Sequence, residues 1–230
     1  MKRRPGTESG PIRRFLRDNG LTLVMLALFF GALVPMSIVG MVTENTERRE
    51  HGEPSLTYGQ YLASGPFIEG VFENWESEFL QMGVYVLATV FFFQVGSPES
   101  KSLEEREPQD VEPRRQRYPD RPEPVRRGGI WLRLYVNSLS IALFALFLTS
   151  MALHALGGAW AFNEEQLSHG GATISILRYV TTSRFWFESF QNWQSEFMAV
   201  AALVVLSIWL RQQGSPESKP VAAPHRQTGT

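Results

Sequence analysis

The sequence predicts an all-α integral membrane protein with four transmembrane helices, arranged as two tandem hairpin repeats of the same orientation. Two apolar runs, residues 21–42 and 134–156, each reach the roughly 20 residues that span a bilayer. The segment 72–101 recurs as 190–219 at an offset of 118 residues, and 14 of its 30 positions are identical. The hydrophobic content of 43% resembles that of a soluble protein only because it averages apolar blocks with polar tails.

The first span, residues 21–42, follows a basic N-terminus and therefore imitates a secretory signal. The run is longer than the apolar core of a signal peptide, which has about 7–15 residues, and no clear small-x-small cleavage site follows it. Asn19 and Gly40, which flank the span or lie in it, recur as Asn137 and Gly158. We therefore expect the segment to be retained as the first half of a repeated unit.

The segment between the first two spans is long for a simple connection and is expected to hold structure of its own. Tyr58, Tyr61 and Leu62 stand at i, i+3 and i+4, and three apolar residues occupy the matching positions 118 residues later. This spacing predicts a short helix lying on the membrane surface in each external segment. Gly65 and Pro66 are expected to end the first of these helices.

The second helix of each hairpin is expected to begin near Asn74 and Asn192, because asparagine is a good N-cap residue. Each is expected to end at a glycine followed by Ser-Pro, at Gly96 and Gly214, because proline cannot continue a helix. The four predicted spans are residues 21–42, 75–95, 131–156 and 193–213.

Residues 102–129 are rich in proline and in both signs of charge and hold few apolar side chains. Such a segment cannot bury enough surface to offset its conformational entropy, so we expect a disordered linker. The predicted organisation is a basic N-terminus at 1–20, hairpin repeat 1 at 21–101, the linker at 102–129, hairpin repeat 2 at 130–219 and a disordered tail at 220–230.

The lysines and arginines set the orientation of the chain in the membrane. Eighteen of the 22 lie in the N-terminus, around the linker or after the fourth span, and four lie in the two segments within the hairpins. We therefore expect both termini and the linker to be cytoplasmic.

The motif Asn-Trp-x-Ser-Glu-Phe occurs at the start of both second helices. Only 14 uncharged residues separate Glu196 from Arg211, about 22 Å along a helix, whereas the hydrocarbon core is about 30 Å thick. The two glutamates could form a quasi-symmetric cation or proton site, or they could simply suit a helix start beside an interfacial tryptophan. The candidate ion or proton site comprises Glu78, Glu196, Ser77 and Ser195, and the interfacial motif comprises Asn74, Trp75, Asn192 and Trp193.

Gly-Ser-Pro-Glu-Ser-Lys is the second repeated block and lies at the predicted cytoplasmic ends. It could be a docking element for a partner, or a helix stop followed by polar residues. The candidate docking residues are Gly96, Pro98, Lys101, Gly214, Pro216 and Lys219.

The sequence contains no pattern typical of an enzyme, a cofactor site or a metal site. It has no cysteine, and its four histidines lack the spacing and company of metal ligands. We expect His154 to form a helix–helix hydrogen bond or to lie at the interface rather than to bind a metal. We also expect no cofactor and no nucleic acid partner.

The runs RRFLRDNGLTLVMLALFFGALV, ERREHGEP, FENWESEFLQMGVYVL and GSPESK resemble a bacterial family of small integral membrane proteins that is known only as a domain of unknown function. The resemblance implies a four-span protein of the cell membrane and brings no activity, ligand or catalytic residue.

Two functions remain open from the sequence. The first is a non-enzymatic structural or partner-binding protein of the cell envelope, since the repeated motifs lie at the two interfaces. The alternative is a small ion or proton transporter or channel that uses the glutamate pair. The lipid bilayer is the one partner that the sequence indicates. A conducting form built from four short spans would need a homodimer, and the sequence does not identify a protein partner.

Overall fold

The computed structural model describes residues 10–102, 107–116 and 118–229, and these residues form helices and turns without a strand. The all-α class is therefore confirmed for the described chain. The helices divide between two compact units, and the boundary along the chain follows Phe67. Residues 1–9 of the predicted basic N-terminus and residues 103–106 and 117 of the predicted linker lie outside the described residues.

The first unit contains α1 (Pro11–Asp18), α2 (Gly20–Glu50) and α3 (Tyr58–Leu62). The loop after α2 is held by Asn45, whose amide nitrogen donates to the carbonyl of Leu56 at 3.0 Å and whose amide oxygen accepts from the backbone of the same residue at 2.6 Å. Thr57 caps α3 in a reciprocal arrangement with Gln60. The short helix predicted from the spacing of Tyr58, Tyr61 and Leu62 is therefore present.

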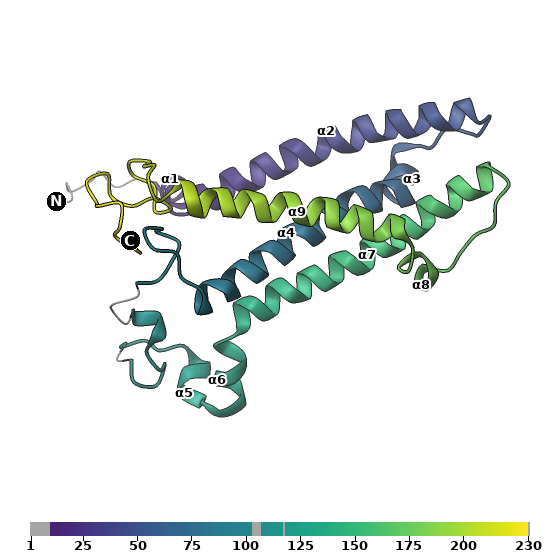
Figure 1. Ribbon diagram of the computed structural model, residues 1–230. Coiled ribbons are helices and arrows are strands. Elements are labelled where there is room, and N and C mark those ends of the chain that lie inside the picture. Colours follow the sequence, from purple (N-terminus) through teal and green to yellow (C-terminus); the bar gives the residue numbers. More distant parts are fainter. Residues whose placement is uncertain (1–9, 103–106, 117, 230) are drawn as a thin grey trace. The chain divides into compact units, whose positions relative to one another are not determined.

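The second unit contains the remaining helices and the 3₁₀ turn Pro108–Asp110. Three of its helices are long, and α8 stands at the turn between α7 and α9 (Figure 1). Their bounds are α4 (Gly65–Phe91, which begins at the unit boundary), α5 (Glu123–Arg127), α6 (Gly129–Tyr135), α7 (Ser138–Ser168), α8 (Ile176–Tyr179) and α9 (Ser183–Leu206).

Local structure recurs at the offset of 118 residues. Both α2 and α7 have 31 residues with equivalent bounds, and a short helix follows each of them. Asn163 holds the backbone of Ile174 with the same two hydrogen bonds, at 2.9 and 2.8 Å, that Asn45 makes to Leu56. The same residue types therefore stabilise the same loop twice.

The helix starts predicted at Asn74 and Asn192 are wrong. The helix α4 begins at Gly65, with Pro66 in its first turn where a missing N–H costs nothing, so Gly65 and Pro66 start a helix rather than end one. The helix α9 begins at Ser183 after Thr182, whose hydroxyl accepts from the backbone of Phe185. Asn74 lies inside α4 and donates to the carbonyl of Gly70 instead of capping the helix.

The helices also end before the predicted glycines, α4 at Phe91 and α9 at Leu206. In the first block the hydroxyl of Ser100 accepts from the backbone N–H of Gln94 at 2.9 Å, and Ser218 accepts from Gln212 at 2.9 Å in the second. The serines of the repeated block thus hold a turn in place of a further helical turn. Gly96 and Gly214 have φ of +88° and +87°, in the left-handed region that favours glycine.

The tail, for which we expected disorder, forms turns around Lys219. This lysine is buried, and its ammonium donates to the carbonyl oxygens of Gly96, His225 and Gln227. The predicted linker likewise contains α5 and the turn Pro108–Asp110 among its described residues.

Two helices of the described chain, α2 and α7, are long and apolar enough to cross a membrane. The predicted third span is divided, because α6 ends at Tyr135 and α7 begins at Ser138. The four-span arrangement itself stays a prediction.

Candidate functional site

The second unit gathers a cluster of charged and polar side chains where the beginnings of α4 and α9 meet the second half of α7 and the short α8. We call it the acid–histidine cluster. Its members are Glu69, Glu73 and Glu76 of α4, His154 of α7, Tyr179 of α8, and Arg184 and Glu188 of α9.

Two adjacent glycines of α7 let the other helices approach the cluster closely. A Cβ atom on Gly157 would lie 2.5 Å from the backbone nitrogen of Glu69, so α4 packs directly on the backbone of α7 at this point. A Cβ on Gly158 would lie 2.6 Å from the hydroxyl of Tyr179. Small residues at these positions therefore bring the carboxylates of α4 and the hydroxyl of α8 near His154.

His154 is the centre of the cluster, and its side chain is 0% exposed. Its Nδ1 lies 2.8 Å from Oε2 of Glu76, which is equally buried, and the carboxylate accepts the bond. Trp193 donates its indole N–H to the other oxygen of Glu76 at 3.0 Å. The ring of His154 stacks on Phe185, with centroids 4.8 Å apart. These contacts fix the ring and place the proton of the neutral tautomer on Nδ1.

The second nitrogen of the ring has no good hydrogen bond. His154 Nε2 lies 3.5 Å from Oε2 of Glu188, at the limit of a hydrogen bond and poorly aligned, and it finds no other hydrogen-bonding partner among the described residues. Buried polar atoms of folded proteins are almost always satisfied. In the neutral tautomer with its proton on Nδ1, the lone pair of the buried Nε2 can therefore bind a cation.

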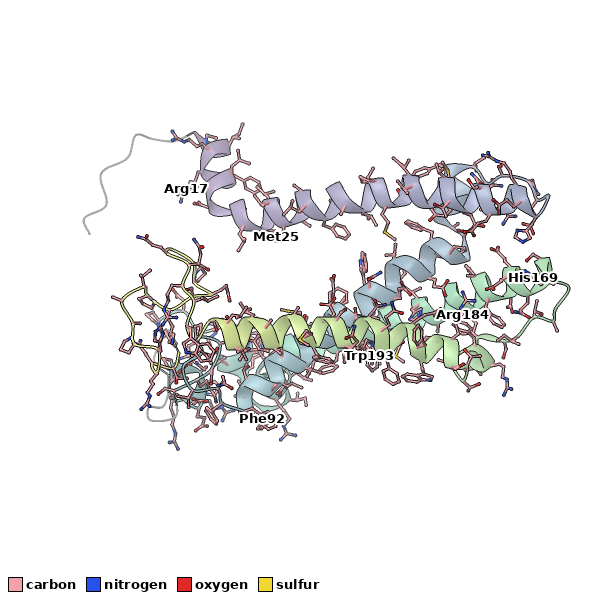
Figure 2. The ribbon with its side chains drawn as sticks, turned by 45° about the horizontal axis from the view of Figure 1, so that its top comes forward. Arg17, Met25, Phe92, His169, Arg184 and Trp193 are labelled. Atoms are coloured by element: carbon pink, nitrogen blue, oxygen red, sulfur yellow. The ribbon has the colours of Figure 1, made fainter. Side chains whose placement is uncertain are left out.

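Tyr179 and Arg184 hold the carboxylates that face His154. The hydroxyl of Tyr179 lies 2.9 Å from Oε2 of Glu188 and 3.2 Å from Oε1 of Glu69. Arg184 donates from Nε to Oε1 of Glu188 at 3.0 Å and pairs through its other end with Glu165. Figure 2 shows Arg184 on the part of α9 toward His169, with Trp193 further along the same helix.

The electrostatics of the cluster reflect an excess of carboxylates over cationic side chains. Burial raises the pKa of Glu69, and Glu188 raises it further. Burial also raises the pKa of Glu73 to about 7. Burial pushes the pKa of Glu188 upward as well, but its contacts with His154, Tyr179 and Arg184 outweigh burial and hold the pKa below its usual range. Glu188 is thus prepared to stay ionised.

One nitrogen and two carboxylate oxygens of this cluster form a donor set that could hold a metal ion. Ligand atoms of Glu69, His154 and Glu188 all lie within 4.8 Å of one another. One imidazole nitrogen and two carboxylate oxygens are donor types that suit a cation.

The predicted ion site lies elsewhere along α4 and α9. Glu78 is exposed and Glu196 is half-buried, and the two are close enough to interact electrostatically. Ser77 and Ser195 donate to the backbone carbonyls of Asn74 and Asn192 rather than to the glutamates, at 2.7 and 2.8 Å.

Of the predicted interfacial motif, Trp193 joins the acid–histidine cluster through Glu76. Trp75 packs edge-on against the rings of Phe72 and Phe79. Of the two positions expected for His154, a helix–helix hydrogen bond or the membrane interface, the structure shows the hydrogen bond, and its partner is Glu76.

Of the predicted docking residues, Lys219 of the second block contacts Gly96 of the first. Pro98 and Lys101 line a cavity of about 400 Å³. Lys219 donates to the carbonyl of Gly96, and Ser97 contacts Ser207 at 3.3 Å. The tail covers Lys219, which is therefore engaged within the chain.

The glutamates of the cluster do not form a motif along the chain, so the sequence alone does not single them out. Aligning the two repeats nevertheless distinguishes these residues, because a glutamate or histidine in one copy aligns with an uncharged residue in the other. The pairs are Glu69 with Phe187, Glu73 with Gln191, Glu76 with Gln194, Met36 with His154, and Gly70 with Glu188.

Comparison with known families matches residues 12–230 to a domain of unknown function, DUF6766. The matched range contains all of the acid–histidine cluster and both repeated blocks. No match was found among curated proteins or among solved structures. Because the match covers nearly the whole chain, the protein belongs to the DUF6766 family.

Proposed function

We propose that the chain is a non-enzymatic membrane protein that crosses the bilayer four times and binds a cation in the external half of its second unit. The two tandem hairpins have the same orientation, with cytoplasmic termini, in a bacterial cell membrane. The equivalent bounds of α2 and α7 support the repeat. Large apolar side chains exposed on the later parts of α4 and α9, such as Leu87, Val90, Met198 and Leu203, support lipid contact by these helices.

Cation binding is supported by one observation above all, the buried Nε2 of His154 among carboxylates. Glu69, Glu76 and Glu188 surround the fully buried His154, which is cationic only when protonated. Besides His154, Arg184 is the described cationic side chain that is ion-paired with this group. Buried charges without counter-charges cost several kcal/mol, of order 3–5 when one partner of a buried pair is removed. A cation at this point balances the charge and satisfies Nε2.

The test is a cation panel on the full chain in lipid nanodiscs after treatment with a chelator. The midpoint of thermal unfolding is measured with Na⁺, K⁺, Mg²⁺, Ca²⁺, Mn²⁺ and Zn²⁺ for the native chain and for Glu188→Gln. A ligand that binds only the folded state stabilises it by about 2.7 kcal/mol at 100 times its Kd. We expect at least one cation to raise the midpoint of the native chain and not that of the variant.

The exposed Glu50 at the end of α2 provides the matched control, because Glu50→Gln makes the same chemical change outside the cluster. It should respond to cations as the native chain does. If no cation raises the midpoint of the native chain more than that of Glu188→Gln, the cluster is neutralised by its own protons and the proposed function is wrong.

The double variant Glu78→Gln, Glu196→Gln discriminates between the two candidate sites. We expect it to keep the cation response, because the glutamates of the repeated motif are exposed or half-buried and lie outside the acid–histidine cluster. Loss of the response in this variant, with its retention in Glu188→Gln, would return the site to the glutamate pair.

A further inference from the structure

We infer that the cation is a first-row divalent transition metal ion of the Zn²⁺ type, bound by His154 Nε2 and by one carboxylate oxygen each of Glu69 and Glu188. This inference rests on the proposed cation-binding function and names its ligand class. The cluster supplies more than neighbouring acids, because a fully buried ring nitrogen without a good hydrogen bond is directed into it.

The distances suit such an ion. A tetrahedral ion with bonds of about 2.1 Å holds its ligand atoms about 3.4 Å apart. His154 Nε2 and Glu188 Oε2 are 3.5 Å apart, and the oxygen of Glu69 completes a set that lies within 4.8 Å. Ion binding would draw the more widely separated atoms of this set together, to about 3.4 Å. The hydroxyl of Tyr179 lies beside both carboxylates, 2.9 Å from Glu188 and 3.2 Å from Glu69.

The residues that contact the proposed ligands also suit a metal-bound histidine. Histidine ligands usually donate their other N–H to a carboxylate, which fixes the ring and strengthens the metal-binding nitrogen. Glu76 accepts from Nδ1 of His154 at 2.8 Å and is itself held by Trp193. Arg184 holds the other oxygen of Glu188 at 3.0 Å. The ligand side chains are therefore oriented before any ion arrives.

The donor types select the class of ion. Ca²⁺ takes about 6–8 oxygen ligands, and Mg²⁺ keeps several of its waters, whereas imidazole nitrogen suits zinc, iron and other first-row ions. The chain has no cysteine, so a thiolate site for Cu⁺ is excluded. One imidazole and two carboxylates are ligands that suit Zn²⁺. Because Zn²⁺ has no visible spectrum, Co²⁺ serves as its spectroscopic substitute.

The test is a Co²⁺ titration of the purified full chain in nanodiscs after chelation, followed by competition with Zn²⁺. We expect one equivalent of Co²⁺ to give the intense visible bands of a tetrahedral site, and Zn²⁺ to displace it. His154→Met introduces the residue that stands at the matching position of the first repeat, Met36. This variant and Glu188→Gln should lose the bands, while Glu50→Gln should keep them.

Glu76→Gln separates ligands from orienting residues. Loss of a residue that hydrogen-bonds to a metal ligand weakens metal binding about 10- to 100-fold. The affinity of Glu76→Gln should fall in this range, with the tetrahedral spectrum retained at saturation. If His154→Met does not fold, Glu69→Gln tests the same site without removing the ring.

The inference is overturned if Co²⁺ and Zn²⁺ bind Glu188→Gln and Glu69→Gln as tightly as the native chain, or if neither ion binds the native chain. Stabilisation by Na⁺, K⁺, Mg²⁺ or Ca²⁺ alone would also overturn it while leaving the proposed cation-binding function intact. Failure of the whole panel would remove both, so the two results are distinguishable.

Discussion

The loop between α2 and α3 and the loop between α7 and α8 are the same structure used twice. Asn45 and Asn163 clamp the loops with matching pairs of hydrogen bonds. Tyr61 meets Gly40, and Tyr179 meets Gly158, across the same sequence separation. The difference lies in what surrounds the tyrosine, because the hydroxyl of Tyr179 is joined to the acid–histidine cluster through Glu69 and Glu188.

In this comparison the asparagines shared by the two copies hold the loops, whereas the histidine and the glutamates of the acid–histidine cluster are residues in which the copies differ. His154 stands where the first copy has Met36, and Glu188 stands where it has Gly70. The shared glutamate pair of the repeated motif, by contrast, is exposed at Glu78. Changes at matched positions should therefore have unequal effects wherever the cluster is involved.

The largest difference is expected between Glu76→Ala and Gln194→Ala. Removing Glu76 leaves His154 and the indole N–H of Trp193 buried without their acceptor, and should cost about 3–5 kcal/mol. Gln194 is exposed and should change stability by less than about 0.5 kcal/mol. Chemical unfolding of the purified proteins measures both, and equal losses would contradict the unequal roles of the two copies.

Gly158→Ala and Gly40→Ala form the second comparison. Each new methyl group would press on a tyrosine hydroxyl and should cost about 1–3 kcal/mol as overpacking. Only Gly158→Ala should also weaken cation binding, because only Tyr179 contacts the carboxylates of the cluster. The thermal midpoint with and without the cation separates the two effects. Gly31→Ala, where the added methyl meets nothing within 4 Å, is the control.

Asn45→Ala and Asn163→Ala should have nearly equal effects, of about 1–2 kcal/mol each. Both remove a donor and an acceptor from one loop residue, Leu56 or Ile174. Neither should change cation affinity, because neither side chain contacts the acid–histidine cluster. A loss of affinity in Asn163→Ala that exceeds its loss of stability would show that the loop is more than a support.

The last comparison concerns pH dependence and uses Glu73→Gln, which gives the first copy the amide that the second copy has at Gln191. The pKa of Glu73 is raised to about 7, above its ordinary value of 4.5, so the acid is neutral in the folded protein at low pH. Its contribution to stability is complete below pH 4.5 and is lost as the pH rises through 7. The native thermal midpoint should therefore fall between pH 5 and pH 8 more than that of Glu73→Gln.

The sequence predicts that the long helices exist but not where they begin and end. Apolar runs and the repeat predicted the long helices, and the spacing of Tyr58, Tyr61 and Leu62 predicted α3. The starts of α4 and α9 lie before the asparagines that the sequence favours as caps, and Asn74 bonds to Gly70 within the helix. A capping residue type marks a helix start only when its backbone leaves the helical conformation.

The acid–histidine cluster could not be predicted because its members are brought together by helix packing. His154 and Glu76 are 78 residues apart, and Trp193 and Glu76 are 117 residues apart. The approach of α4 to α7 depends on Gly157, whose role is not visible in a sequence without knowledge of the facing helix. A helix–helix hydrogen bond was one of the two positions expected for His154, because a histidine in an apolar run needs a polar partner. The identity of that partner was not predicted.

The contacts of Glu76 also set the rotational register of three helices. One carboxylate on α4 is joined to α7 through His154 and to α9 through Trp193. Successive residues of an α-helix are about 100° apart around the axis, so turning α4 by a single residue would break both bonds at once. A conformational change that moves the three helices together can therefore keep both hydrogen bonds. Rotation of α4 about its own axis would first have to break the bonds of Glu76 to His154 and to Trp193.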